Sequence, residues 1–338
     1  MSGEALVWTG ATQTTPLTAN ALTFAIAMHD ARGLADVRLG RFVFTSGAIR
    51  PVQIDGASVL VRAPSGTKVE AVAGAPVVLS GGVQDFDWLA GGRVSQTIAS
   101  RVIVGLSYVQ RRSGGDLADE EVGTDLSATP ARWLDLAGRA SYDLTAPGIS
   151  EALASAAVRA GDFRVELFAI DRSPSRLLPQ TSLFSIFGDF PSQSVGGNVW
   201  WKAAPRLDVW LSGAGQSVGG VYGGNGSLRA RLKLDDRGDG AVGVELRRQD
   251  VSTARWTGVR VTATRPFART LRASTELELV VPDDPQNKGS AWPWALVSVG
   301  WRPHKTWELA CAVESASTPE HTFEFNALAR LSLFWEKK

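Results

Sequence analysis

The sequence contains few of the residues on which enzymes and metalloproteins depend. Its one cysteine, Cys311, cannot form an internal disulfide, so cysteine chemistry does not reveal the compartment. Its three histidines, His29, His304 and His321, lie in no metal-ligand spacing and in no nucleophile elbow. No paired-carboxylate pattern accompanies them. We therefore expect no catalytic residue, no metal, no cofactor and no enzymatic activity.

Long apolar runs are also missing. No stretch approaches the roughly 20 residues that a helix needs to cross a bilayer. This excludes a helical membrane protein. Lipid can otherwise be spanned only by closed β-barrels, because every backbone N–H and C=O must find a partner without water.

Neither sign of charge dominates the chain. It has 35 basic and 34 acidic residues and a formal net charge of +1, so it lacks the basic character of nucleic-acid proteins, and we expect no nucleic-acid partner. Of the basic residues, 28 are arginine, which suits fixed recognition of carboxylate, sulfate or phosphate groups. A GC-rich genome would produce the same bias, and both explanations stay open.

What the chain has is a repeated alternation of polar and apolar residues, clearest from about residue 194 to the end. Leu228, Ala230, Leu232 and Leu234 alternate with Arg229, Arg231, Lys233 and Asp235. A period of two is typical of strands, whose successive side chains face opposite sides of a sheet. Many such hairpins with one charged face predict an all-β, closed antiparallel transmembrane β-barrel. At about 20 residues per strand and connection, we expect about 16 strands, within a range of 14 to 18.

The domain organisation follows from this pattern. Residues 1–18 are polar and rich in Thr and Gly, which predicts a flexible N-terminal lead or plug, and residues 19–338 form the barrel. We expect a turn around residues 85–92 and an acidic loop over residues 113–129. Residues 173–194 combine strand-breaking prolines with apolar residues that demand burial. Either a constriction loop folded into the barrel, with Leu183, Phe184, Phe187 and Phe190, or an external loop packed on itself satisfies both demands.

Tryptophans near strand ends predict membrane girdles, where aromatic rings lie at the lipid–water interface. Of the 12 tryptophans, those expected in the girdles are Trp200, Trp201, Trp256, Trp292, Trp294, Trp301, Trp307 and Trp335.

Two segments resemble known barrels. Residues 323–335 alternate and end in an aromatic residue, which resembles the C-terminal strand of outer-membrane barrels, although Glu336, Lys337 and Lys338 follow. Residues 38–41 and 49–57 resemble the opening strands of the alginate-export type of porin-like barrel. This second resemblance implies a monomeric channel whose arginine-lined lumen passes an anionic saccharide.

The location implied is the outer membrane of a Gram-negative bacterium, with membrane lipid as the surrounding partner. The sequence begins Met1-Ser2-Gly3-Glu4 without a signal peptide, so we expect that the leader was removed or replaced by a start methionine.

The expected lumen residues are charged side chains on the polar faces of the C-terminal strands. They are Arg229, Arg231, Lys233, Glu245, Arg247, Arg260, Arg272, Glu276 and Glu278. Facing rows of opposite charge would form a selectivity filter, or the same residues would only pair with one another and keep the wall rigid. The leading functional hypothesis is a porin-like channel for small or anionic solutes, or for export of a polysaccharide. The alternative is a plugged structural barrel that has an envelope-spanning secretion or motility machine as its partner.

Overall fold

The chain forms a single antiparallel β-sheet. The computed structural model describes residues 2–10, 18–77, 87–173, 192–236, 238–251, 254–284, 290–317 and 323–333. Within these residues no helix is long and apolar enough to cross a membrane. The strands are β1 Ser2–Gly10, β2 Thr18–His29, β3 Ala35–Ser46, β4 Ile49–Arg62, β5 Thr67–Pro76, β6 Asp87–Ile98, β7 Val102–Ser113, β8 Asp116–Ala131, β9 Leu134–Asp143, β10 Gly148–Ala160, β11 Phe163–Arg172, β12 Ser192–Ala204, β13 Leu207–Val218, β14 Val221–Lys233, β15 Ala241–Val251, β16 Ala254–Ala268, β17 Leu271–Pro282, β18 Trp292–His304, β19 Trp307–Ala316 and β20 Glu324–Leu333.

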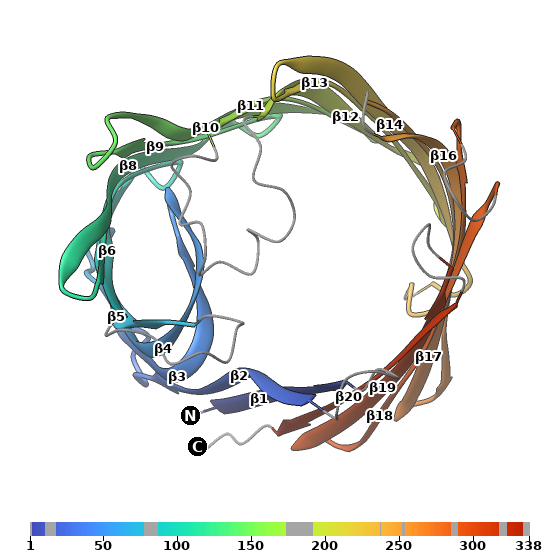
Figure 1. Cartoon of the computed structure of the whole chain (residues 1–338), viewed down its shortest axis with the longest axis horizontal. Coiled ribbons are helices and arrows are strands. Elements are labelled where there is room, and N and C mark those ends of the chain that lie inside the picture. Colours follow the sequence, from blue (N-terminus) through green and yellow to red (C-terminus); the bar gives the residue numbers. More distant parts are fainter. Residues whose placement is uncertain are drawn as a thin grey trace.

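Each strand pairs with the next one along the chain, and the sheet curls into a ring (Figure 1). β1 and β20 lie in contact where the ends of the sheet meet, although the described residues include no backbone ladder between them. Because 20 strands run up and down in turn, β1 begins and β20 ends at the same rim of the ring. We call this the near rim. Its connections range from two residues, for example 161–162 and 205–206, to the seven residues 234–240, whereas the two longest connections, residues 77–86 and 173–191, join strands at the far rim.

The strand count of 20 is higher than the expected 16 and lies outside the range of 14 to 18. Three segments account for most of the difference. Residues 2–10, expected in a flexible lead or plug, form β1 and pair with β2. Residues 87–92 begin β6 rather than a turn. The expected acidic loop is β8, in which Asp119, Glu121 and Asp125 lie on one face while Val122 and Leu126 lie on the other, exposed face.

The two faces of the sheet differ as the alternation predicts. The outer face carries large apolar side chains that remain exposed, such as Leu228, Leu246 and Leu277, at 45%, 49% and 51% exposed. The inner face carries most of the charged side chains, and many of these are half-buried. This is the reverse of a water-soluble protein, in which large contiguous apolar patches are covered.

One hairpin leaves the wall. β3 pairs with β2 only as far as Arg41, and β4 pairs with β5 only from Ile54 onward. Over residues 42–54 the two strands pair with each other, and only Ile54 at the base also pairs with β5; the hairpin that they form lies inside the ring (Figure 1). We call residues 42–54 the inner hairpin. Its buried side chains and those of the wall form the apolar core of the molecule: Ala25, Phe42, Phe44, Ile49, Val52, Ile54, Val72, Leu89 and Val109.

Candidate functional site

The lumen face of the wall is identified by its contact with the inner hairpin. Leu89 of β6 belongs to the core that the hairpin covers, and residues paired directly across a ladder share its face. Leu89 pairs with Arg111, and Arg111 pairs with Asp119. Following the directly paired residues from strand to strand shows that Arg229 of β14 lies on this same face of the sheet. The charged face of the C-terminal strands is therefore the lumen face.

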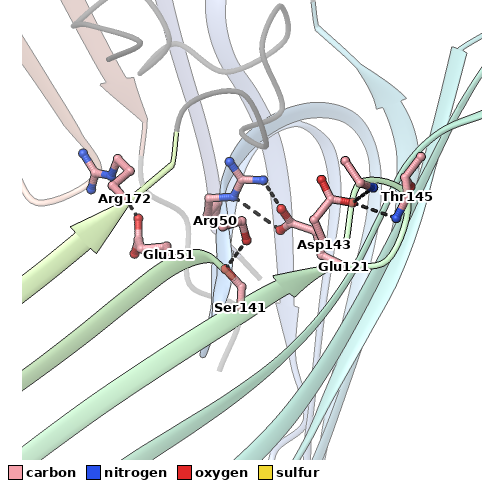
Figure 2. A network of polar contacts seen from close by, with 9 residues as sticks. Arg50, Glu121, Ser141, Asp143, Thr145, Glu151 and Arg172 are labelled. Carbon is pink, nitrogen blue, oxygen red and sulfur yellow. Dashed lines mark hydrogen bonds and ion pairs between the residues drawn. The ribbon is translucent and has the colours of Figure 1, made fainter. Parts of the chain in front are cut away.

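A buried ion pair attaches the inner hairpin to the wall. The Arg50 guanidinium at the start of β4 donates to both carboxylate oxygens of Glu121 on β8, and its Nε lies 3.3 Å from Oε2 (Figure 2). The two side chains are only 7% and 3% exposed. The Ser46 hydroxyl also donates to Glu70 of β5. The hairpin thus has polar contacts with two wall strands.

Backbone contacts at the tip are close. A Cβ built on Gly123 of β8 would lie 2.5 Å from the Ala48 Cβ, so only glycine leaves room for the tip. Gly47 lies over the ion pair of Arg93 with Asp125, in which Nε and Oδ2 are 2.8 Å apart. Glycine on the wall lets the hairpin approach its backbone.

Around Glu121 the wall carries further charged groups, of which Asp143 and Glu151 have partners on the wall and Asp119 has a buried Oδ2 without a hydrogen-bond partner. Asp143 accepts hydrogen bonds from the backbone amides of Thr145 and Ala146 at 2.7 and 2.8 Å, which closes the β9–β10 turn (Figure 2). Glu151 pairs with Arg139 at 2.5 Å and with Arg172 at 3.2 Å. Arg50 is the cation that the hairpin adds to this acidic part of the wall.

The free energy of burying its apolar side chains holds the inner hairpin in a fixed position. Phe42, Phe44, Ile49, Val52 and Ile54 are all at most 4% exposed. Burial of each such side chain contributes about 1.5–3 kcal/mol, so their sum is of the same order as the stability of a whole domain. Spontaneous movement of the hairpin away from the wall would lose all of it. On the opposite side of the hairpin, Thr45 is exposed and Val43 half-exposed, whereas Gln53, the ladder partner of Val43, is 3% exposed.

Six of the nine expected lumen residues form ion pairs. Lys233 pairs with Asp208 at 2.8 Å. Arg260 pairs with Glu276 and Glu278 at 2.8 Å each. Arg247 also contacts Glu278, and Arg272 reaches Asp239 of the β14–β15 turn at 3.5 Å. For these residues the geometry corresponds to a charge-paired wall.

Arg229, Arg231 and Glu245 have no ion-pair partner within the part of the chain that the structure describes. Arg229 lies over the ring of Trp210, with 5.5 Å between its guanidinium carbon and the ring centroid. Arg231 is opposite Asp208 in the ladder, but that carboxylate pairs with Lys233. Two guanidinium groups of β14 therefore keep hydrogen-bond donors available in the lumen.

These residues belong to one row that crosses the inner wall. Its members are directly paired from strand to strand and are Arg164, Trp200, Trp210, Arg229, Glu245, Arg260, Glu278 and Trp294. Aromatic rings next to guanidinium and carboxylate groups can stack on apolar ring faces and hydrogen-bond polar substituents.

Four of the tryptophans expected in the girdles lie on the lumen face instead. Trp200 and Trp294 are members of the row, Trp292 shares the face of Trp294, and Trp256 lies 5.4 Å from the Arg247 guanidinium. Trp294 also donates to Glu314 at 2.5 Å. Position near a strand end does not select a face, whereas the period of two does.

Three tryptophans lie on the outer face, which leaves the girdle expectation open for them. Trp201 stacks on Phe163 with 5.6 Å between ring centroids, and Trp301 meets Trp307 edge to face at 5.2 Å.

Several expected residues lie outside the described part of the chain: Leu183, Phe184, Phe187, Phe190 and Trp335. Among the described residues, no group of three His, Cys, Asp or Glu side chains could hold a metal ion.

The inner hairpin and its contacts were not expected from the sequence. Phe42, Phe44, Val52 and Ile54 alternate as in any wall strand. The available signal was Arg50, a single charge in an apolar hairpin, because a buried arginine needs a carboxylate partner elsewhere in the chain.

Comparison with known proteins agrees with the fold. No family model and no curated protein matches the sequence. Among solved structures, the P pilus usher (PapC) translocation pore superposes with a TM-score of 0.53 at 9% identity, over 96% of this chain and 88% of that one. A bacterial polysaccharide outer membrane secretin matches with a TM-score of 0.46 at 9% identity, over 80% and 98% of the two chains. A mutant Rh. blastica porin matches with a TM-score of 0.45 at 11% identity, over 74% and 91%. The expected resemblance to outer-membrane barrels is confirmed, and the chain has the fold of the outer-membrane β-barrel proteins.

Proposed function

We propose that the chain is a closed outer-membrane β-barrel that works as a channel for small or anionic solutes. The observation that carries this proposal is the continuous separation of faces, exposed apolar residues outside and charged residues inside, round the ring of 20 strands. An outward apolar band belongs in lipid, and a polar inner wall belongs in water. The fold shared with the usher pore supports the same location in the outer membrane of a Gram-negative bacterium.

Closure is supported by the contact of β1 with β20 and by the cost of leaving edges unpaired. Inside a bilayer each unpaired backbone group costs several kcal/mol, so an open seam is unfavourable. Twenty strands lie between the 16 to 18 strands of barrels with a water-filled channel and the 22 strands of barrels with a plugged lumen, so the strand number fits either of the two candidate functions.

The solute class follows from the cations of β14. Arg229 and Arg231 lack carboxylate partners among the described residues, and Trp200 and Trp210 lie beside them in the row. This combination suits a saccharide or other small molecule that bears carboxylate groups. It also fits export of an acidic polysaccharide.

The test is the reversal potential in a salt gradient across a planar bilayer. We expect the double variant R229E and R231E to shift selectivity away from anions, because it changes the lumen charge by four units. The control is R248E, since Arg248 lies on the outward-facing set of β15 and pairs with Asp283 near the far rim. Equal shifts in both variants, or none, would exclude β14 as the selectivity element.

A second candidate function is favoured by the inner hairpin. Its apolar core fills part of the lumen, which fits a plugged structural barrel within a secretion or motility machine. A folded wild-type barrel that conducts no ions would support this alternative.

A further inference from the structure

The inner hairpin divides the ring into two unequal parts. Its buried face lies on the inner wall of β5 to β8, where Val72, Leu89 and Val109 complete the core. On its other face Thr45 is exposed and Val43 half-exposed. The division concerns the lumen alone, since the wall ladders continue behind the hairpin.

We propose that the inner hairpin is the fixed constriction of the channel. It seals the part of the lumen over β5 to β8 and confines solutes to the part lined by β9 to β20. This inference rests on the proposed channel function and adds the element that sets the width and local charge of the conduit. Val43 and Thr45 would then border the moving solute.

The bend that places the hairpin inside the ring is built into the wall. Gly40 and Gly56 are paired where β3 and β4 leave their neighbours. Gly40 has φ +117°, and a Cβ on Gly56 would lie 2.2 Å from the Ala73 carbonyl oxygen. Glycine allows both the unusual backbone angle and the close approach of strands.

The contacts at the far end hold the tip against the wall. The buried pair of Arg50 with Glu121, the Ser46 bond to Glu70 and the fit of Ala48 over Gly123 join three separate points of the hairpin to two strands. A hairpin fixed at its base by glycines and at its tip by a buried ion pair narrows the lumen permanently.

The first test removes the hairpin. Arg41 and Asp55 are opposite each other in the ladder, so a two-residue Asn-Gly turn can replace residues 42–54 and close the shortened β3–β4 hairpin. Single-channel conductance in a planar bilayer is measured for this variant and the wild type, with uncharged polymers of graded size as probes. We expect higher conductance and a shift of the exclusion limit to larger polymers.

The second test keeps the hairpin and changes its charge. T45R places a cation on the face that borders the conduit, and T270R places one in an exposed near-rim turn as a control. We expect the reversal potential to shift toward anions in T45R by more than in T270R. This variant decides the question if the shortened chain does not fold.

The outcomes separate the two proposals. A conducting wild type with unchanged conductance in the shortened, folded variant would overturn the constriction and leave the channel standing. Equal reversal potentials in T45R and T270R would overturn the constriction in the same way. Folded barrels that conduct neither with nor without the hairpin would overturn the channel and the constriction together. A silent wild type beside a conducting shortened variant would overturn the constriction, since the hairpin would then plug the lumen instead of narrowing it.

Discussion

The ion pair between Arg50 and Glu121 provides the sharpest test of how the inner hairpin is held. R50M keeps most of the side-chain volume and leaves Glu121 beside Asp119 and Asp143 without its cation, while E121Q leaves the guanidinium without its carboxylate. Since the two side chains are 7% and 3% exposed, each single substitution should cost about 3–5 kcal/mol of unfolding free energy.

The loss of unfolding free energy in the double variant should differ from the sum of the losses in the two single variants. With both members of the pair neutral, neither leaves the other as an unpaired buried charge, although the buried Asp119 loses its attraction to Arg50 in the double variant as it does in R50M. R50M combined with E121Q should therefore cost less than the two single changes together. The coupling energy should then be about 3 kcal/mol.

Denaturant unfolding of the barrel in detergent, followed by tryptophan fluorescence, measures all four proteins. The control pair is Arg159 with Asp135, whose side chains are 50% and 25% exposed. R159M should change the unfolding free energy by less than about 1 kcal/mol. If the double variant loses as much unfolding free energy as R50M and E121Q together, the two residues are not coupled. This result would refute the buried ion pair and the fixed position of the hairpin.

Two further predictions concern the faces of the wall and its bend. W301F should lower the quenching of tryptophan emission by brominated lipid, whereas W294F should not, because Trp301 lies outside and Trp294 bonds Glu314 on the lumen side. Equal effects would mean that the faces are assigned wrongly. G40A should destabilise the barrel by at least about 1–3 kcal/mol, because its φ is +117° and its Cβ would meet the Phe24 carbonyl oxygen at 2.1 Å. G300A, at a position with nothing within 4 Å, serves as the control, and denaturation midpoints that do not separate the two variants would contradict the account of the bend.

Much of the wall was predictable from the sequence because its period of two is long and regular. The alternation of Leu228, Ala230 and Leu232 with Arg229, Arg231 and Lys233 lies within β14 Val221–Lys233, as the period of two predicts. β8 was missed because its acidic residues suggest a loop in water, although on a lumen face they are the expected side chains. The acidic composition of this segment suggested a loop, whereas its alternation of polar and apolar residues alone would have predicted a strand.

The site was less predictable, since a period of two assigns faces but not distant contacts. Trp294 is in phase with Ser298 and out of phase with the exposed Val297 and Val299, so the sequence did contain the signal that it faces the lumen. For the departure of residues 42–54 from the wall, the only local signal is the single charge of Arg50, which does not identify its partner. The departure depends on Glu121, which lies 71 residues after Arg50 in the chain.

The most direct test of the central claim is the single-channel conductance of the purified wild-type chain in a planar bilayer, after its fold has been checked by heat-modifiable electrophoretic mobility. An open conduit beside the inner hairpin predicts discrete conductance steps that grow when residues 42–54 are replaced by Asn-Gly. A folded, inserted barrel that stays silent in both forms would contradict the channel and leave the plugged structural component as the better account.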